Sequence, residues 1–181
     1  MNIIKITDKP KLKTSQIMQM CRDKFSIWSY YDDARLDKGF PAPKKETTRY
    51  FIKEQEPDKE TLGLSVNEFE KKYPKENGIT LRERLLLELA YFDETGEHLD
   101  VKGITFCSGS RFSNGLVPGV FLNNDEVRVL WYYLGRSSSD YGVRSCIDIE
   151  NKVQSDNEND TNKQGFNITC ERCGLCVHIK S

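Results

Sequence analysis

Apolar residues recur at helical spacing near the start of the chain. Ile17, Cys21 and Phe25 fall four apart, which predicts a helix from about residue 15 to residue 24 with one face on a core. Thr14 or Ser15 is the expected N-cap of this helix. A short strand over residues 3–6 is predicted before it.

Two further helices are predicted from the residues that begin them. Ser65 with Glu68, and Thr80 with Glu83, have the spacing of a capping box, in which hydroxyl and carboxylate each satisfy a backbone amide. The first helix should run about eight residues and end near Tyr73. The second should end at Gly96. Its apolar stripe consists of Leu81, Leu85, Leu86 and Leu89, widened by Ala90 and Phe92, and its charged residues are predicted to face water: Arg82, Glu83, Arg84 and Glu88.

Residues 32–45 have the charges, glycine and prolines of a long surface loop. Asp32, Asp33 and Asp37 carry the ligand type that Mg²⁺ and Ca²⁺ prefer, but the Gly and Glu spacing of a calcium loop is missing. A solvated loop is therefore the preferred interpretation.

The chain changes character after Leu99. Residues 99–106, 117–122, 126–134 and 143–149 are rich in β-branched and aromatic residues and are predicted strands. The run Asn123 to Asp125 is a turn signal, because Asn and Asp tolerate left-handed backbone angles. The fold class is therefore α+β, with N-terminal helices packed against a C-terminal antiparallel β region.

Charge and composition limit the class of protein. The 27 Lys and Arg residues nearly balance the 28 Asp and Glu residues, which argues against general binding to DNA or RNA. No apolar run is long enough to cross a membrane, and no signal-peptide pattern is evident, so we place the protein in the cytoplasm. We expect a domain over 1–149, a flexible polar linker over 150–165 and a Cys-rich tail over 166–181.

Long polar side chains are depleted in one window of the β half. Lys, Glu, Gln and Met number 40 in the 181 residues, but residues 103–146 contain a single one, Glu126. Strand and loop propensities account for part of this deficit. A surface rich in Tyr, Ser, Asn and Gly is also physically suited to recognition, since aromatic rings give contact area and small polar groups adapt their hydrogen bonds.

Four short segments carry a family resemblance within residues 99–146. In chain order they are Ser108-Gly109-Ser110-Arg111, Val117-Pro118-Gly119-Val120, Val127-Arg128-Val129 and Gly142-Val143-Arg144-Ser145. This order resembles the C-terminal part of the C-type-lectin-fold variable proteins of diversity-generating retroelements, whose fold is shared with the formylglycine-generating enzymes. In that family an error-prone reverse transcriptase replaces template adenines. The codons that result include Asn, Ser, Gly, Asp, Tyr, Phe, Leu, Val, Arg and Cys, and exclude Lys, Gln, Glu, Met and Trp.

The resemblance implies a hypervariable surface, spanning about residues 103–146, that binds a ligand, most simply a protein, without catalysis. Tyr132, Tyr133, Tyr141 and Phe121 would be the aromatic anchors. The fixed scaffold would comprise Val127, Val129, Leu130, Trp131, Gly142, Val143 and Arg144. The varied positions would be Phe112, Ser113, Asn114, Leu116, Phe121, Asn123, Asn124, Tyr132, Tyr133, Ser137, Ser138, Ser139, Asp140 and Tyr141.

The C-terminal tail supports an alternative function, a small intracellular metal-binding protein. Cys170, Cys173, Cys176 and His178 lie within nine residues and are candidate zinc ligands, although structural zinc sites usually take a second ligand pair from a distant segment. An iron–sulfur cluster with Cys146 as fourth ligand, and a tail without any ligand, stay open.

The sequence contains little that indicates catalysis. His98 is isolated from any second histidine before the tail, so a hydrogen-bonded or surface role is favoured over that of a base. Cys107 and Cys146 match, by resemblance alone, the cysteine pair of a formylglycine-generating oxidase, which is a remote alternative. The ligand and the oligomeric state do not follow from the sequence.

Overall fold

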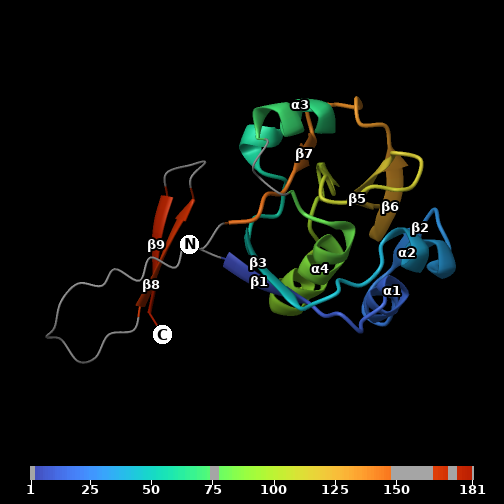
Figure 1. Ribbon diagram of the computed structural model, residues 1–181, viewed down its shortest axis with the longest axis horizontal. Coiled ribbons are helices and arrows are strands. Elements are labelled where there is room, and N and C mark those ends of the chain that lie inside the picture. The colour runs from blue at the N-terminus through green and yellow to red at the C-terminus, as the bar shows by residue number, and fades with distance from the viewer. Residues whose placement is uncertain (1–2, 74–77, 148–164, 171–174, 181) are drawn as a thin grey trace, which may run out of the picture. The chain divides into compact units, whose positions relative to one another are not determined.

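The structure, a computed structural model, describes residues 3–73, 78–147, 165–170 and 175–180. It divides into an N-terminal unit over 2–146 and a C-terminal unit over 147–181 (Figure 1). The fold class is mixed α+β, as predicted. The elements in chain order are β1 (Ile3–Asp8), α1 (Thr14–Arg22), β2 (Ile27–Ser29), α2 (Asp33–Gly39), β3 (Thr47–Ile52), η1 (Lys59–Thr61, a 3₁₀ turn), α3 (Val66–Lys72), α4 (Leu81–Thr95), β4 (Ile104–Phe106), β5 (Val117–Asn123), β6 (Glu126–Tyr132), β7 (Tyr141–Val143), β8 (Gly165–Cys170) and β9 (Leu175–Lys180).

A five-stranded sheet with the order β2-β6-β5-β4-β7 organises the N-terminal unit. Its three central strands are antiparallel, as predicted, whereas β2 and β7 add in parallel at the two edges. Both faces of the sheet are covered. One face, with Val120 and Val129, belongs to the main core with α1 and α4, and the other, with Val117, packs against Val66 and Phe69 of α3.

Helix α4 runs through the centre of the unit, and the prediction that its charged residues face water is wrong (Figure 1). Arg82 and Glu83 are 4% and 5% exposed, and Arg84 and Glu88 are fully buried. Periodicity assigns charged residues to solvent, but no residue of α4 from Leu81 to Phe92 is exposed, and only its last residues, Asp93 to Thr95, reach solvent. The four charges are buried because each of them has a partner.

The partners of Arg84 form a buried charge network. The Arg84 guanidinium donates to Glu88 at 2.7 Å and to Asp100 at 2.7 Å and 3.0 Å. Arg144 donates to the other Asp100 oxygen at 2.5 Å and to Thr105 Oγ1 at 3.0 Å. Two positive and two negative side chains therefore compensate one another inside the core.

Asp100 also explains why the strand predicted over residues 99–106 is confined to Ile104–Phe106. Its φ of 54° lies in the left-handed region, which a strand cannot continue through. Its amide donates to the Gln55 carbonyl at 2.7 Å. With this turn, the Asp100 carboxylate lies between Arg84 and Arg144. The segment around Asp100 therefore takes part in the buried charge network and does not pair as a strand.

Helix starts were predicted well where a capping box was present. Thr80 and Glu83 exchange hydrogen bonds of 2.8 Å and 3.2 Å, and Ser65 and Glu68 exchange bonds of 2.8 Å and 3.3 Å. Gly96 ends α4 with a φ of 71°, as predicted.

The N-cap predicted for the first helix is wrong, because that helix begins at Thr14 and its N-cap is Lys13. The Thr14 hydroxyl instead donates to the Phe40 carbonyl and accepts from Arg82. Residues that a sequence would assign to capping are therefore used in tertiary contacts.

The loop predicted over residues 32–45 is wrong over α2. Asp32 caps this helix by accepting from the Arg35 amide at 2.8 Å, and Leu36 is fully buried. Asp33 pairs with Arg22, and Asp37 accepts from Ser15. The three aspartates therefore have separate structural partners.

The last predicted strand, over 143–149, also differs, because β7 covers Tyr141–Val143 and ends where that strand was expected to begin. Residues 148 and 149 of the prediction lie outside the described residues. By contrast, Asn124 and Asp125 have φ values of 50° and 58°, as the turn prediction requires. In the described residues, none of the helices is long and apolar enough to cross a membrane.

Replacing Asp100 by Asn should lower the unfolding free energy by about 3–5 kcal/mol, because two buried arginines would lose the carboxylate between them. The control is Asp93→Asn, which removes an exposed partner of Lys24 and should change stability by less than about 0.5 kcal/mol. Urea unfolding at neutral pH measures both. Similar losses in the two variants would contradict the role of the network.

Stability should also fall in acid. Burial raises the pKa of Glu88, but the Arg84 charge and hydrogen bonds from His98 and Arg84 outweigh it and hold that pKa below its usual range. A carboxyl group whose pKa is lower in the folded than in the unfolded state stabilises the fold at pH values above the unfolded pKa. This contribution is complete above about pH 4.5 and is lost as the pH falls through the lowered pKa of the folded state. Urea midpoints from pH 7 to pH 3 should fall less steeply for Glu88→Gln than for wild type. Equal slopes would contradict this.

Candidate functional site

The loops before β5 and after β6 meet at one end of the β5–β6 pair. Val117 pairs with Tyr132, so both loops leave the sheet from the same side (Figure 1). The first loop is closed by the Phe112 amide donating to the Leu116 carbonyl at 2.9 Å. The second is held at Leu134, whose carbonyl accepts from α3, and at Asp140, whose carbonyl accepts from β4. We call this region, residues 112–116 and 133–140, the loop end of the sheet.

The fourteen predicted recognition residues divide by exposure and by place. Seven are exposed: Ser113, Asn114, Asn124, Tyr133, Ser137, Ser139 and Asp140. Seven are half-buried: Phe112, Leu116, Phe121, Asn123, Tyr132, Ser138 and Tyr141. The loop end brings nine of them together, whereas Asn123 and Asn124 lie in the turn at the opposite end of the β5–β6 pair.

The predicted aromatic anchors do not share one environment. Tyr133 is 79% exposed, the largest value among the exposed hydrophobic residues. Tyr132 lies over Gly119, where an added Cβ would come within 2.5 Å of its ring, and it packs edge-on against Phe106 and Tyr141. Burial raises the pKa of the Tyr132 hydroxyl to about 12. Tyr132 and Tyr141 therefore contribute to the α3 side of the core, and only Tyr133 stands free of it.

The residues assigned to a fixed scaffold occupy scaffold positions. Val127, Val129 and Val143 are buried, and Trp131 packs on the main core through Phe40. Arg144 donates to the Glu54 and Gln55 carbonyls at 2.8 Å each as well as to Asp100. These contacts tie the chain beyond β7 to the core. The set also includes Gly142, which is buried, and Leu130, which is half-buried.

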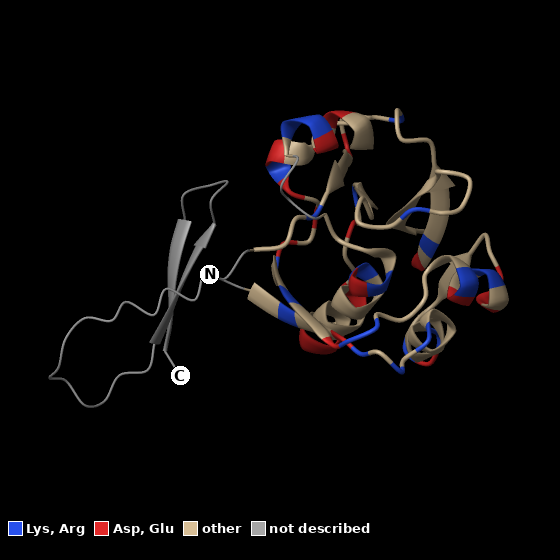
Figure 2. Ribbon diagram, viewed as in Figure 1, with Lys and Arg blue, Asp and Glu red and all other residues tan. Residues whose placement is uncertain are grey.

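The depletion of long polar side chains in residues 103–146 is found at exposed positions. Within 103–146, none of the 12 exposed residues is Lys, Glu, Gln or Met, whereas these types make up 22 of the 40 exposed residues among the other described residues up to 102. Burial therefore does not account for the deficit. In Figure 2 the segment from β5 to β7 is mostly tan, whereas α2 and α3 are banded in the red and blue of charged residues.

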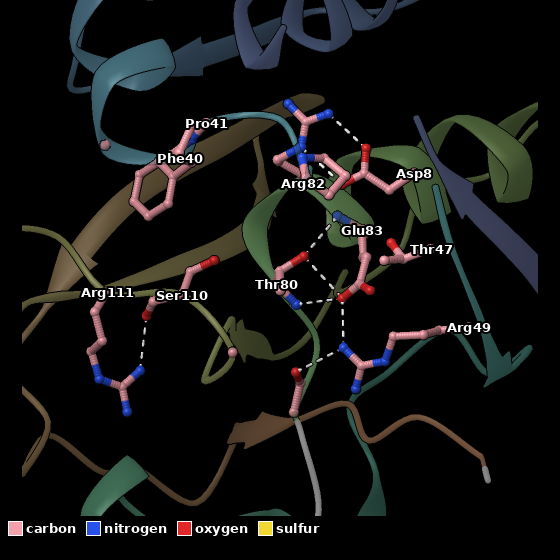
Figure 3. A pocket seen from close by; sticks show the side chains of 14 residues that line it. Asp8, Phe40, Pro41, Thr47, Arg49, Thr80, Arg82, Glu83, Ser110 and Arg111 are labelled. Atoms are coloured by element: carbon pink, nitrogen blue, oxygen red, sulfur yellow. Dashed lines mark hydrogen bonds and ion pairs between the residues drawn. The ribbon is translucent and has the colours of Figure 1, made fainter. Parts of the chain in front are cut away.

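A pocket of about 470 Å³ lies at the N-terminus of α4 (Figure 3), and none of the predicted recognition residues lines it, although Phe112 packs against Phe40 of its wall. Phe40, Pro41 and Pro43 form its apolar wall. Its polar lining comes from β1, β3, α4 and the segment after β4: Asp8, Thr47, Arg49, Thr80, Arg82, Glu83, Ser110 and Arg111. The capping box of Thr80 and Glu83 indicates the helix start, but nothing local in the sequence indicates the pocket, because the strands that close it are distant in sequence.

Charges in this pocket are paired within the protein. Arg82 donates to both Asp8 oxygens, at 2.6 Å and 2.8 Å, and Arg49 donates to Glu83 at 2.8 Å. The Ser110 hydroxyl accepts from the Leu81 amide at 2.9 Å. These groups hold the first turn of α4 against β1 and β3, so the pocket is primarily a structural junction.

The cysteines and histidine of the N-terminal unit have structural surroundings. Cys107 is fully buried, and burial raises the pKa of its thiol, which keeps it from the reactive thiolate form. Burial also raises the pKa of Cys21 to about 12, and Cys146 is half-buried. His98 makes a 2.8 Å hydrogen bond to Glu88 between the rings of Phe25 and Phe92. Among the described residues, no group of three or more His, Cys, Asp or Glu side chains is placed to hold a metal.

The tail candidates for metal binding fall on the β8–β9 hairpin. Cys170 is paired with Leu175, Cys176 with Thr169, and His178 with Asn167. Cys176 and His178 therefore share one set of alternate positions, and Cys170 belongs to the other. Cys173 lies outside the described residues, and zinc binding stays a prediction.

Single substitutions at Tyr132 and Tyr133 should have different effects on stability. Tyr132→Ala should lower the unfolding free energy by about 2–4 kcal/mol, because a ring packed over Gly119 is lost. Tyr133→Ala should change it by less than about 0.5 kcal/mol. Urea denaturation compares the two variants with wild type. A stable Tyr132→Ala variant would show that its ring is not part of the core.

Comparisons of the chain with protein-family models, with curated proteins and with solved structures find no match. No relative or structural neighbour therefore bears on its function. What the protein does has to be inferred from its own residues.

Proposed function

We propose that the protein is a variable recognition protein that binds a ligand, most simply another protein, through the loop end of the sheet and performs no catalysis. The contact surface would consist of Ser113, Asn114 and Gly115 from the first loop, and Tyr133 with 135–140 from the second. Tyr133 would be its aromatic anchor.

The main support for this proposal is the absence of Lys, Glu, Gln and Met from the exposed positions of residues 103–146. Solvent-facing positions ordinarily accept Lys and Glu freely, and the rest of the described N-terminal unit does so. An avoidance of charge does not account for the contrast, because Asp125, Arg136 and Asp140 are exposed in the same window. The residue types present and absent are those expected if adenines of a template had been replaced.

The surroundings of the loops support the same function. Both faces of the sheet beneath them are packed, and Arg144 fixes the chain just beyond β7 to the charge network. The loop tips Ser113 to Gly115 and 135–137 are exposed, so substitutions there leave the core contacts in place. A surface of this kind can change its residues without unfolding.

We also propose that the N-terminal unit is a C-type-lectin-like domain, as the resemblance implies. Three of the four segments that carry the resemblance contribute to the sheet, whereas Ser108 to Arg111 follow β4. Val117 to Val120 are in β5, Val127 to Val129 are in β6, and Gly142 and Val143 are in β7. Shared scaffold with divergent loops is the arrangement that this family uses.

Sequencing sister copies of the gene tests the proposed function. Codons for exposed loop residues, such as Ser113, Asn114, Tyr133 and Ser139, should differ between copies. Codons for Val120, Val129 and Arg144 should not. A second copy of the coding stretch for residues 103–146 should lie beside a reverse transcriptase gene. The two copies of this stretch should differ mainly at adenines. Differences spread evenly over loop and core codons, or the absence of such a second copy, would refute the proposal.

A further inference from the structure

The first loop at the loop end begins with a side chain that packs on the main core. The Phe112 ring stacks on that of Tyr31, with centroids 4.6 Å apart and planes 2° from parallel. It also contacts the rings of Phe40 and Trp131, at centroid distances of 5.7 Å and 5.2 Å. A Cβ added to Gly39 would come within 2.6 Å of the same ring. Because the ring is enclosed from several sides, a small side chain at this position would leave these contacts unfilled.

The rest of the first loop is closed by its backbone. The Gly115 amide donates to the Phe112 carbonyl at 2.9 Å, and the Phe112 amide donates to the Leu116 carbonyl at 2.9 Å. Gly115 has a φ of 83°, in the left-handed region that favours glycine. Apart from its chain neighbours, no described residue has an atom within 4 Å of a Cβ added there, so backbone conformation and not space selects glycine. The loop is therefore a tight turn with fixed ends.

Between these fixed ends lie Ser113 and Asn114, which are exposed. We propose that they are the specificity-determining residues of the first loop, and that Phe112 and Gly115 are positioning residues that hold them in place. The family resemblance assigns Phe112 to the varied positions, whereas its packing assigns it to the scaffold. The inference rests on the proposed function and narrows its variable contacts in this loop to two residues.

The turn also determines which group of Asn114 a ligand can bind. Its Oδ1 accepts from the Leu116 amide at 3.2 Å, so its Nδ2 group, with two N–H donors, is the part that is left for a ligand. The Ser113 hydroxyl is a further donor. The matching ligand group is an acceptor, most simply a backbone carbonyl on the surface of a protein. Because the tip is held before binding, little ordering entropy opposes this contact.

Backbone ¹⁵N order parameters of the full chain, measured by NMR, test the positioning role. In wild type the amides of residues 113–115 should give values of about 0.8, close to those of a rigid backbone. Phe112→Ser removes the ring and should lower them below about 0.6. Ser113→Ala, a change at the neighbouring exposed position, should leave them unchanged. The amides of Leu85 and Val129 should stay rigid in every variant, which shows that each chain is folded.

A second pair of variants acts from outside the first loop. Gly39→Ala should displace the Phe112 ring and loosen residues 113–115, although the sequence of the loop is unchanged. Gly135→Ala should not, because the nearest atom to the added Cβ is Asn67 Nδ2 at 3.9 Å. A mobile tip in wild type, or equal order in wild type, Phe112→Ser and Gly39→Ala, would overturn the positioning role.

Sister copies of the gene test the specificity role. Codons 113 and 114 should differ between copies, whereas codon 112 should keep Phe and codon 115 should keep Gly. Copies that vary at 112 and 115 as freely as at 113 and 114 would overturn this inference and leave the proposed function intact. Copies in which the loop codons, including those for residues 133–140, do not vary would refute the proposed function, and the specificity role with it.

Discussion

The buried pairing of two arginines with two carboxylates holds the N-terminal unit together. Each of these ions would cost several kcal/mol to bury alone, so the four are stable only as a set. Arg84 and Glu88 come from α4, Asp100 from the turn after it, and Arg144 from the chain beyond β7. Arg84 is thereby fixed to the same point as Asp100 and Arg144, which lie 16 and 60 positions further along the chain. The network is thus a geometric constraint more than a source of net stability.

That constraint extends to the sheet. The Asp100 carbonyl accepts from the Leu122 amide in β5 at 3.1 Å, and Thr105 in β4 accepts from Arg144. The strands that lead to the loop end are therefore tied to the same charges as α4. The loops need not contribute to the core in return, because their tips, 113–115 and 135–137, are exposed. A fixed base with tolerant loops is what a recognition surface requires.

Sequence patterns predicted those parts of the fold that depend on local chemistry. The Thr80–Glu83 capping box and the Asn123 to Asp125 turn satisfy backbone groups within a few residues, so the chain itself indicates them. The buried charges of α4 did not follow from the sequence, because their partners are distant and periodicity treats any charge as exposed. Helix α2 was missed for a similar reason, since Leu36 is its single fully buried residue and proline and glycine follow close behind.

Nine of the fourteen predicted recognition residues lie at the loop end of the sheet, but the sequence did not separate the exposed positions from the packed ones. Alternation of apolar and polar residues along a strand distinguishes core from surface positions only when one face of the sheet is exposed to solvent. Here α3 and α4 cover both faces. Tyr132 therefore packs on the core although Tyr133, the next residue, is exposed. Residue type alone did not distinguish the two tyrosines, whereas the contacts of each ring do. Variation in residues 103–146 is therefore compatible with folding at the loop tips and costly on the strands, which limits the proposed recognition surface to two short loops.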